Sequence, residues 1–168
     1  MREKSAFPTQ AMVSAAVSKA GKNRLIIIPT GARLNSKAYQ EKIMAKLIPD
    51  MERLTGNDYI FQQDGARCHT SASTVSYLDE NVPDYIPPAH WPSNSCDLNP
   101  LDYYVWSRLE GFVYRGERIR SLDQLRIRVR QAWAKLPQDE INRAIDSFRK
   151  RLRAVRAADG GHIVKFKL

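Results

Sequence analysis

Cysteine is scarce in this sequence, which has two of these residues, Cys68 and Cys96, in 168 positions. Two cysteines cannot form the disulfide framework that stabilises small secreted domains, so we expect free thiols in a reduced intracellular protein. A zinc site that combines them with His69 and His90 is the alternative. The spacing argues against it, because these residues lack the short C-x-x-C or H-x-x-x-H separation that structural zinc sites use.

Long apolar runs are also absent, since no stretch reaches the roughly 18 consecutive apolar residues that a membrane-spanning helix needs. The first twenty residues mix charged residues, Pro8 and Gln10 with short apolar pieces, unlike a secretory signal. The sequence has neither an internal repeat nor a low-complexity linker. Because 43% of its residues are hydrophobic, we expect one domain with its own core and no membrane partner.

Positive charge is concentrated at one end of the chain. Residues 1–106 hold 11 Lys or Arg and 11 Asp or Glu, whereas residues 107–168 hold 16 and 7, so the whole formal charge of +9 lies in the last third (16 − 7 = 9). A concentrated cationic region attracts a polyanion such as DNA by neutralising phosphates and releasing counterions. The alternative is a helix face that is merely solvated.

Hydrophobic periodicity predicts strands early in the chain. Short apolar or β-branched runs at 11–18, 24–29 and 59–63 indicate strands. A helix should begin at Asn35 or Ser36 and be kinked or divided at Pro49, which lacks an N–H group and crowds the preceding turn.

Later segments are predicted to be helical, over 69–81, from about residue 101, and through most of the last third. Ser121-Leu-Asp-Gln124 fits a capping box, Pro137 suits the first turn of another helix, and Gly160-Gly161 supplies its stop. Strands that lead and helices that trail indicate an α/β or α+β fold.

Two acidic residues occupy positions from which a carboxylate could enter a cleft. Asp64 follows the predicted strand at 59–63 and precedes a glycine, and Asp102 lies at the start of a predicted helix. Each has a structural alternative, Asp64 as a turn former and Asp102 as a helix-start residue favoured by the helix dipole. Asp97, in the loop that precedes Asp102, is better interpreted as a loop cap. From residue type alone, Asp64 and Asp102 can be interpreted as a metal-binding pair or as these structural residues.

Two long segments around these acids resemble motifs of the mariner-like transposases of the Tc/mariner superfamily. Residues 61–69, FQQDGARCH, resemble the family's FQQDNAPCH-type segment, and residues 91–103, WPSNSCDLNPLDY, resemble its WPPxSPDLNPLDY segment. Trp106 lies where the family has an aromatic residue, and residues 12–18 (MVSAAVS) are similar to its MVWGAVS strand. The similarity continues through 150–155 to Gly160-Gly161-His162 and so covers almost the whole chain.

The resemblance implies an RNase H-like fold, a mixed sheet flanked by helices, with a carboxylate triad that holds two divalent ions, Mg²⁺ or Mn²⁺. Asp64 matches the second carboxylate and Asp102 the third, so both are the implied catalytic and metal-binding residues, whereas Asp97 matches a loop residue. Two ions ~3.5–4 Å apart stabilise the attacking and leaving oxygens during displacement at phosphorus. The resemblance further implies DNA as a partner, a homodimer, a nuclear location and no small-molecule cofactor.

The chain also departs from the family's pattern. Gly65, Arg67 and Cys96 replace Asn, Pro and Pro, and Ser14-Ala15 replaces Trp-Gly. The family's first-carboxylate strand, which precedes its MVWGAVS strand, is not recognisable in residues 1–11. We therefore expect a partial RNase H-like domain over 1–168 that lacks its first strand, with a sheet-containing core at 1–106 and a helical basic tail at 107–168. The isolated chain should have little or no strand-cleavage activity.

The alternative function is a non-catalytic module that binds nucleic acid, or an intact transposase, through its basic C-terminal helices. These cations could equally form a solvated face, and several must flank the apolar stripe of their helices. The residues expected to contact phosphates are Arg126, Arg128, Arg130, Arg149, Lys150, Arg151, Arg153 and Arg156.

Overall fold

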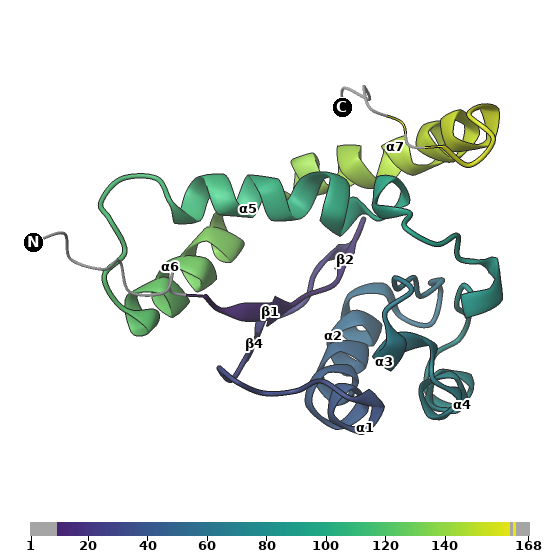
Figure 1. Ribbon diagram of the computed structural model, residues 1–168, viewed down its shortest axis with the longest axis horizontal. Helices are drawn as coiled ribbons and strands as arrows, with labels where there is room; N and C mark the ends of the chain where they lie inside the picture. Colours follow the sequence, from purple (N-terminus) through teal and green to yellow (C-terminus); the bar gives the residue numbers. More distant parts are fainter. Residues whose placement is uncertain (1–9, 162, 164–168) are drawn as a thin grey trace, which may run out of the picture.

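The structure, a computed structural model, describes residues 10–161 and residue 163, and it consists of short strands followed by helices (Figure 1). No helix in this part of the chain is long and apolar enough to cross a membrane. Single π or 3-10 turns are labelled η. In chain order the elements are β1 (Met12–Ser14), β2 (Val17–Ser18), β3 (Gly21–Lys22), β4 (Ile26–Ile28), α1 (Ser36–Tyr39), η1 (Gln40–Met44), α2 (Ala45–Thr55), α3 (Arg67–Thr70), α4 (Ala72–Asn81), η2 (Pro88–His90), η3 (Cys96–Leu98), η4 (Leu101–Val105), α5 (Trp106–Val113), α6 (Leu122–Lys135) and α7 (Gln138–Ala157).

The strands form one antiparallel hairpin, whose first arm is residues 12–18 and whose return arm is residues 21–28. β1 pairs with β4, with Met12 opposite Ile28, and β2 pairs with β3. The segment 59–63, predicted as a strand, makes only an isolated parallel bridge between Phe61 and Tyr85. Because backbone groups pair only where a neighbouring strand lies alongside, the predicted mixed sheet is reduced in the described residues to these short ladders.

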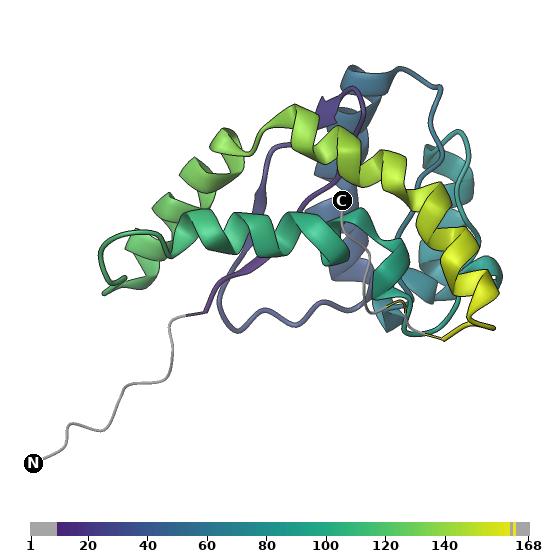
Figure 2. The same ribbon diagram turned by 90° about the horizontal axis from the view of Figure 1, so that it is seen from above.

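The hairpin separates two hydrophobic clusters. Val13 and Ala15 contact the first cluster, which is built from η4, α5, α6 and α7 and includes the buried Trp133. Ile26 and Ile28 contact the second cluster, built mainly from α1, η1, α2 and α4. Figure 1 shows the hairpin between these two groups of helices, and Figure 2 shows the same arrangement from above. The hairpin is thus a shared wall with apolar side chains on both faces.

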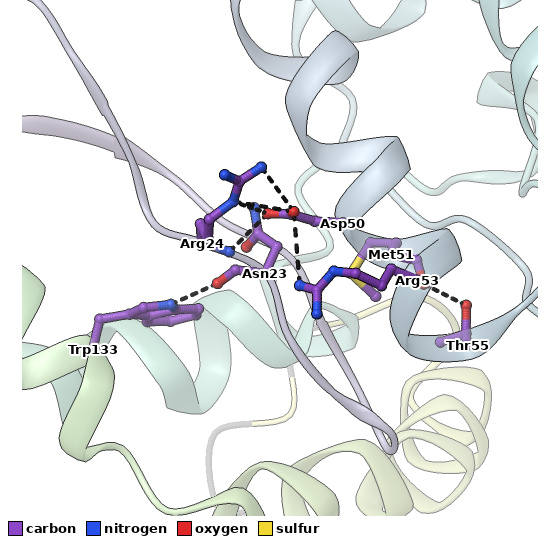
Figure 3. Close-up of polar contacts among 7 residues, drawn as sticks. All are labelled: Asn23, Arg24, Asp50, Met51, Arg53, Thr55 and Trp133. Carbon is purple, nitrogen blue, oxygen red and sulfur yellow. Dashed lines mark hydrogen bonds and ion pairs between the residues drawn. The ribbon is translucent and has the colours of Figure 1, made fainter.

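Buried polar contacts at the start of the return arm fix the hairpin between the helices (Figure 3). Trp133 Nε1, on α6, donates to the carbonyl oxygen of Asn23 at 2.8 Å, and Asn23 Oδ1 accepts the backbone N–H of Ala16 at 2.7 Å. Arg24 donates its backbone N–H and its Nε to the buried carboxylate of Asp50 on α2, at 3.1 and 3.0 Å. One dipeptide therefore ties the hairpin to a helix of each cluster.

The helix predicted to begin near Asn35 is divided, although not at Pro49. Asn35 caps α1, since its Oδ1 accepts the N–H of Ala38 at 2.8 Å. The π turn η1 then separates α1 from α2, and α2 continues through Pro49 to Thr55. The predicted division of the helix at Pro49 is therefore wrong. A proline ring crowds the carbonyl oxygen four residues before it, which here belongs to Ala45. Ala45 directly follows the π turn η1, which is wider than an α-helical turn.

The last two helices are predicted correctly as helices but are not a tail. Ser121 Oγ accepts the N–H of Gln124 at 3.1 Å to begin α6, and α7 follows Pro137. Both helices belong to the first cluster, in which Trp133 is 5% exposed and Ile141 is fully buried. The described part of the basic last third is therefore packed into the core, and its cations other than Arg151 are at least partly exposed.

Replacing Asp50 with asparagine should lower the free energy of unfolding by about 1–3 kcal/mol, because it removes the charge from a buried group that accepts several hydrogen bonds. Hydrogen bonds from the Arg24 side chain hold the pKa of Asp50 below its ordinary 3.8. The stabilisation by the carboxylate is therefore present above pH 3.8 and is lost as the pH falls through the lower pKa of the folded state. Urea unfolding at neutral and acidic pH measures both effects. Asp58→Asn, at an exposed position, is the control, and a D50N chain as stable as its parent at pH 7 would contradict this account.

Candidate active site

A cavity of about 990 Å³ lies between the first arm of the hairpin and the segment 59–64, and both Asp64 and Asp102 line it. Apolar side chains complete its walls, including Ile43 and Met51 of the second cluster and Phe148 of α7. Two acids that lie in separate sequence motifs are thereby brought to one place. Their catalytic and metal-binding roles remain predictions.

Two glutamines fix the direction in which the chain reaches the first acid. Gln62 Nε2 donates to the carbonyl oxygen of Leu98 at 3.2 Å. Gln63 Oε1 accepts the hydroxyl of Tyr39 at 3.0 Å, and its Nε2 donates to the carbonyl oxygen of His69 at 3.0 Å. Neighbouring side chains of an extended chain point to opposite faces, so the pair anchors this segment to elements on both of its sides.

Asp64 is held by its own turn and by His69. Its Oδ1 accepts the backbone N–H of Ala66 at 3.0 Å and lies 2.6 Å from His69 Nδ1. The hydrogen bond with His69 is the main cause that lowers the pKa of Asp64. The Tyr39 ring packs on the imidazole, with 4.3 Å between centroids. Both contacts of the carboxylate within the described residues use Oδ1, which leaves Oδ2 for another ligand.

Asp102 lies in the first turn of η4, where Asn99 organises the helix start. Asn99 Oδ1 accepts the N–H of Leu101 at 3.1 Å, and its Nδ2 donates to Asp102 Oδ2 at 3.0 Å. Burial raises the pKa of Asp102, and the nearby charge of Asp64 raises it further, against the lowering effect of hydrogen bonds from Asn99 and Trp106. The two acids therefore have opposite pKa shifts although they share one cavity.

This pair has the donor chemistry of a divalent-cation site. Mg²⁺ is commonly bound by one or two carboxylates together with water and substrate phosphate oxygens, and a cation would relieve the repulsion that Asp64 exerts on Asp102. Within residues 10–161 and 163, no group of three or more His, Cys, Asp or Glu side chains is gathered in a way that could hold a metal ion. Asp64 and Asp102 therefore fit such an ion as two of its ligands.

Asp97 lies away from the cavity, in η3. Its Oδ2 accepts the N–H of Ile163 at 3.3 Å, and its carbonyl oxygen accepts from Arg151 at 3.4 Å. This placement agrees with a loop role rather than a position beside Asp64.

The cations predicted to contact phosphates differ in exposure. Arg126 and Arg128 are partly exposed, whereas Arg151 is 5% exposed. The guanidinium of Arg151 lies 3.8 Å from the centre of the Tyr103 ring, and its Nε donates to Ser147 Oγ at 3.3 Å. Because it follows Ser147 by four residues on the buried face of α7, Arg151 joins α7 to η4, and its prediction as a phosphate contact is wrong. The exposed members of the set are Arg130, Arg149, Lys150, Arg153 and Arg156.

The sequence suggested His69 only as a ligand of the disfavoured zinc site and gave Asn99 no role, although both contact the acids. Asn99 carried a signal, since an asparagine before Pro100 at a helix start is a common cap. His69 follows Asp64 by five residues across a turn, a spacing that by itself predicts no contact. Arg149 also lines the cavity. The sequence could not predict this position, because Arg149 lies in a run of cations that look alike.

No family model matches this sequence. Among curated proteins it is 27% identical over 143 residues to the transposable element Tc3 transposase of Caenorhabditis elegans, covering 84% of this chain and 42% of that protein. It is 33% identical over 105 residues to the Tc1 transposase of the same species, covering 62% of this chain and 37% of that protein. The chain thus spans about two fifths of the length of the curated relatives it matches.

The fold is similar to that of the catalytic domain of Mos1 mariner transposase. The TM-score is 0.76 at 21% sequence identity, covering 94% of this chain and 78% of that chain. At this identity the likeness establishes the fold. Together with the two nematode relatives, it confirms the resemblance to mariner-like transposases that the motifs at 61–69 and 91–103 indicate.

The coupling between the two acids can be measured by carboxyl NMR titration. We expect Asp102 to titrate above Asp64, because burial and the Asp64 charge raise its pKa whereas hydrogen bonding with His69 lowers the pKa of Asp64. Asp64→Asn should lower the pKa of Asp102, because it removes a charge that raises it. Asp58→Asn should leave it unchanged. An Asp102 pKa that does not respond to Asp64→Asn would show that the two groups are too far apart to act together.

Proposed function

We propose that this chain, a homologue of the Tc1 and Tc3 transposases with the fold of the Mos1 catalytic domain, serves metal-dependent DNA strand cleavage and transfer through Asp64 and Asp102. The observation that carries the proposal is the convergence of these two acids on one cavity, where the charge of one raises the pKa of the other. Like charges at close range favour a bound cation.

The chain's own residues orient the carboxylates. His69 and the N–H of Ala66 hold Oδ1 of Asp64, and Asn99 holds Oδ2 of Asp102. Structures of the Mos1 catalytic domain with Mn and with Mg support one of these ions as the cofactor. When bound, such an ion supplies charge stabilisation to the attacking and leaving oxygens at phosphorus. Arg149 lines the same cavity, and we expect it to contact a phosphate of the DNA backbone.

Activity of the isolated 168-residue chain is proposed to be weak or absent. Among the described residues the cavity contributes two carboxylates close enough to interact, where the family's chemistry uses three. Fewer carboxylates neutralise less of the charge of two metal ions, so the ions should bind weakly without further ligands from DNA or a partner chain.

A second candidate function, a non-catalytic module that binds DNA or an intact transposase, is favoured by the outer face of α7. Arg149, Lys150, Arg153 and Arg156 are exposed there and form no ion pair with an acid of the described chain. Structures of Mos1 include a Strand Transfer Complex and a paired-end complex with left transposon end, which supports DNA as the partner. Assembly as a homodimer or with an intact transposase, and a nuclear location, are parts of the same proposal.

Binding of Mn²⁺ tests the metal site directly. The ion should broaden NMR signals of residues around Asp64 and Asp102, and Asp64→Asn or Asp102→Asn should each weaken this binding at least tenfold, because each removes one of two charged ligands. Asp58→Asn is the matched control. Broadening that is scattered over the surface, or that both variants leave unchanged, would refute the site.

The same variants address activity. With Mg²⁺ or Mn²⁺ we expect no turnover of transposon-end DNA by the isolated chain. Turnover that Asp64→Asn abolishes would contradict the proposed inactivity but support the catalytic assignment.

The DNA-binding role predicts a steep salt dependence. Replacing Arg149, Lys150 and Arg153 with alanine should reduce the slope of log K against log salt by about 0.9 for each lost phosphate contact on duplex DNA. Replacing the exposed Arg33, Lys42 and Lys46 removes the same charge elsewhere and should change the slope much less. Equal effects of the two triple variants would show attraction by net charge alone.

A further inference from the structure

The wall of the cavity carries charged residues besides Asp64 and Asp102. Lys19, Asp146 and Arg149 also line it. Lys19 lies in the turn of the hairpin between β2 and β3, and the other two lie on α7. The Nζ of Lys19 donates to Asp146 Oδ1 at 2.7 Å, and both side chains are 60% exposed. Because these two side chains line the cavity and are also open to solvent, their ion pair lies where the cavity opens.

Other contacts hold the turn of the hairpin against α7. Gln138 Nε2, at the start of α7, donates to the carbonyl oxygen of Ser18 at 2.8 Å. Val17, the residue before Ser18, packs against the first hydrophobic cluster. An ion pair between exposed side chains contributes little to stability, because water and salt screen it. Lys19 can therefore leave Asp146 without moving the backbone that carries it.

The carboxylate of Asp146 holds Lys19 as a DNA phosphate would. Carboxylates and phosphates both present anionic oxygens that accept short, charge-assisted hydrogen bonds from an ammonium group. Arg149 follows Asp146 by three residues, so the two side chains are neighbours on one face of α7. A DNA backbone that contacts Arg149 would therefore bring phosphates to the part of the cavity wall where Asp146 now pairs with Lys19.

We propose that Lys19 is a further DNA phosphate contact of this cavity, and that Asp146 occupies it until DNA displaces the carboxylate. Lys19 and Arg149 then bind phosphates from two elements, one from the hairpin turn and the other from α7. Asp146 lowers the affinity for DNA, because its charge has to be separated from Lys19 and stays close to the incoming phosphates. This inference rests on the proposed function in one respect, that DNA binds at the cavity, and it requires neither metal binding nor strand cleavage.

The test is equilibrium binding of a fluorescent DNA duplex to the 168-residue chain, without divalent metal and at about 0.15 M salt, which screens distant charges. Asp146→Asn should raise the affinity about threefold, because Lys19 no longer has to leave an ion pair of ordinary exposed strength. Lys19→Ala should lower the affinity by removing a phosphate contact. In a chain that already carries Lys19→Ala, Asp146→Asn should bring no gain, because Lys19 is the group that it releases.

Asp139→Asn is the matched control. Asp139 also lies on α7, is 68% exposed, and forms an ion pair of the same length, 2.7 Å, with Arg143. Neither Asp139 nor Arg143 is among the described residues that line the cavity. Asp139→Asn changes the net charge equally, so it should raise the affinity less, and by the same factor with and without Lys19→Ala. The midpoint of thermal unfolding verifies that each variant folds.

Two results would overturn the inference. The first is a gain from Asp146→Asn that does not exceed the gain from Asp139→Asn, or that persists with Lys19→Ala, since either would show an effect of net charge alone. The second is a loss of both DNA affinity and thermal stability in Asp146→Asn, which would show a structural link between the turn and α7.

These results would leave DNA binding by α7 and the metal site unaffected. If neither the parent chain nor any variant binds the duplex, the proposed DNA-binding role is refuted as a whole, and the role of Lys19 with it.

Discussion

The contacts of Asn23 and Arg24 determine where the hairpin lies, and the two clusters and the cavity depend on that position. The Asn23 carbonyl accepts from Trp133 of α6, and Arg24 binds Asp50 of α2. The buried Nδ2 of Asn23 has no partner among the described residues, so this side chain contributes through its oxygen. Without these contacts, a hairpin with such short ladders would have little to hold it between two helical layers, since isolated hairpins are marginally stable in water.

The two acids illustrate how one cavity produces different carboxyl groups. Burial raises the pKa of both acids, but hydrogen bonds with His69 and Ala66 outweigh it at Asp64, whereas the charge of Asp64 adds to it at Asp102. The residues whose side chains contact the two carboxylates, His69 and Asn99, come from the same two motifs as the acids. Each motif therefore provides both a carboxylate and the group that orients it, which explains why the motifs are long.

Much of the fold could be predicted from local signals. Ser121, Pro137 and Gly160 mark helix ends by capping chemistry that depends on few neighbours, and these predictions are confirmed. The motifs around Asp64 and Asp102 indicated the resemblance to mariner-like transposases because residue order is directly visible in a sequence.

Features that depend on tertiary packing were not predictable. The segment 59–63 has the composition of a strand, yet a ladder forms only where a partner strand lies alongside, and among the described residues this segment makes only the single bridge between Phe61 and Tyr85. Arg151 stands in a run of cations, and only the packing of α7 on Tyr103 reveals that it is buried. The contact of His69 with Asp64 likewise depends on the turn between them.

The stacking of Arg151 on Tyr103 sets the rotational phase of α7. Successive helix residues are about 100° apart around the axis. A one-residue insertion between Ser147, which contacts Tyr103, and Arg149 would therefore turn the exposed cations by more than a quarter of a circle. Point substitutions on the outer face leave this phase intact. The length of α7 up to Arg151 should therefore tolerate change far less than the identity of the cations that it displays.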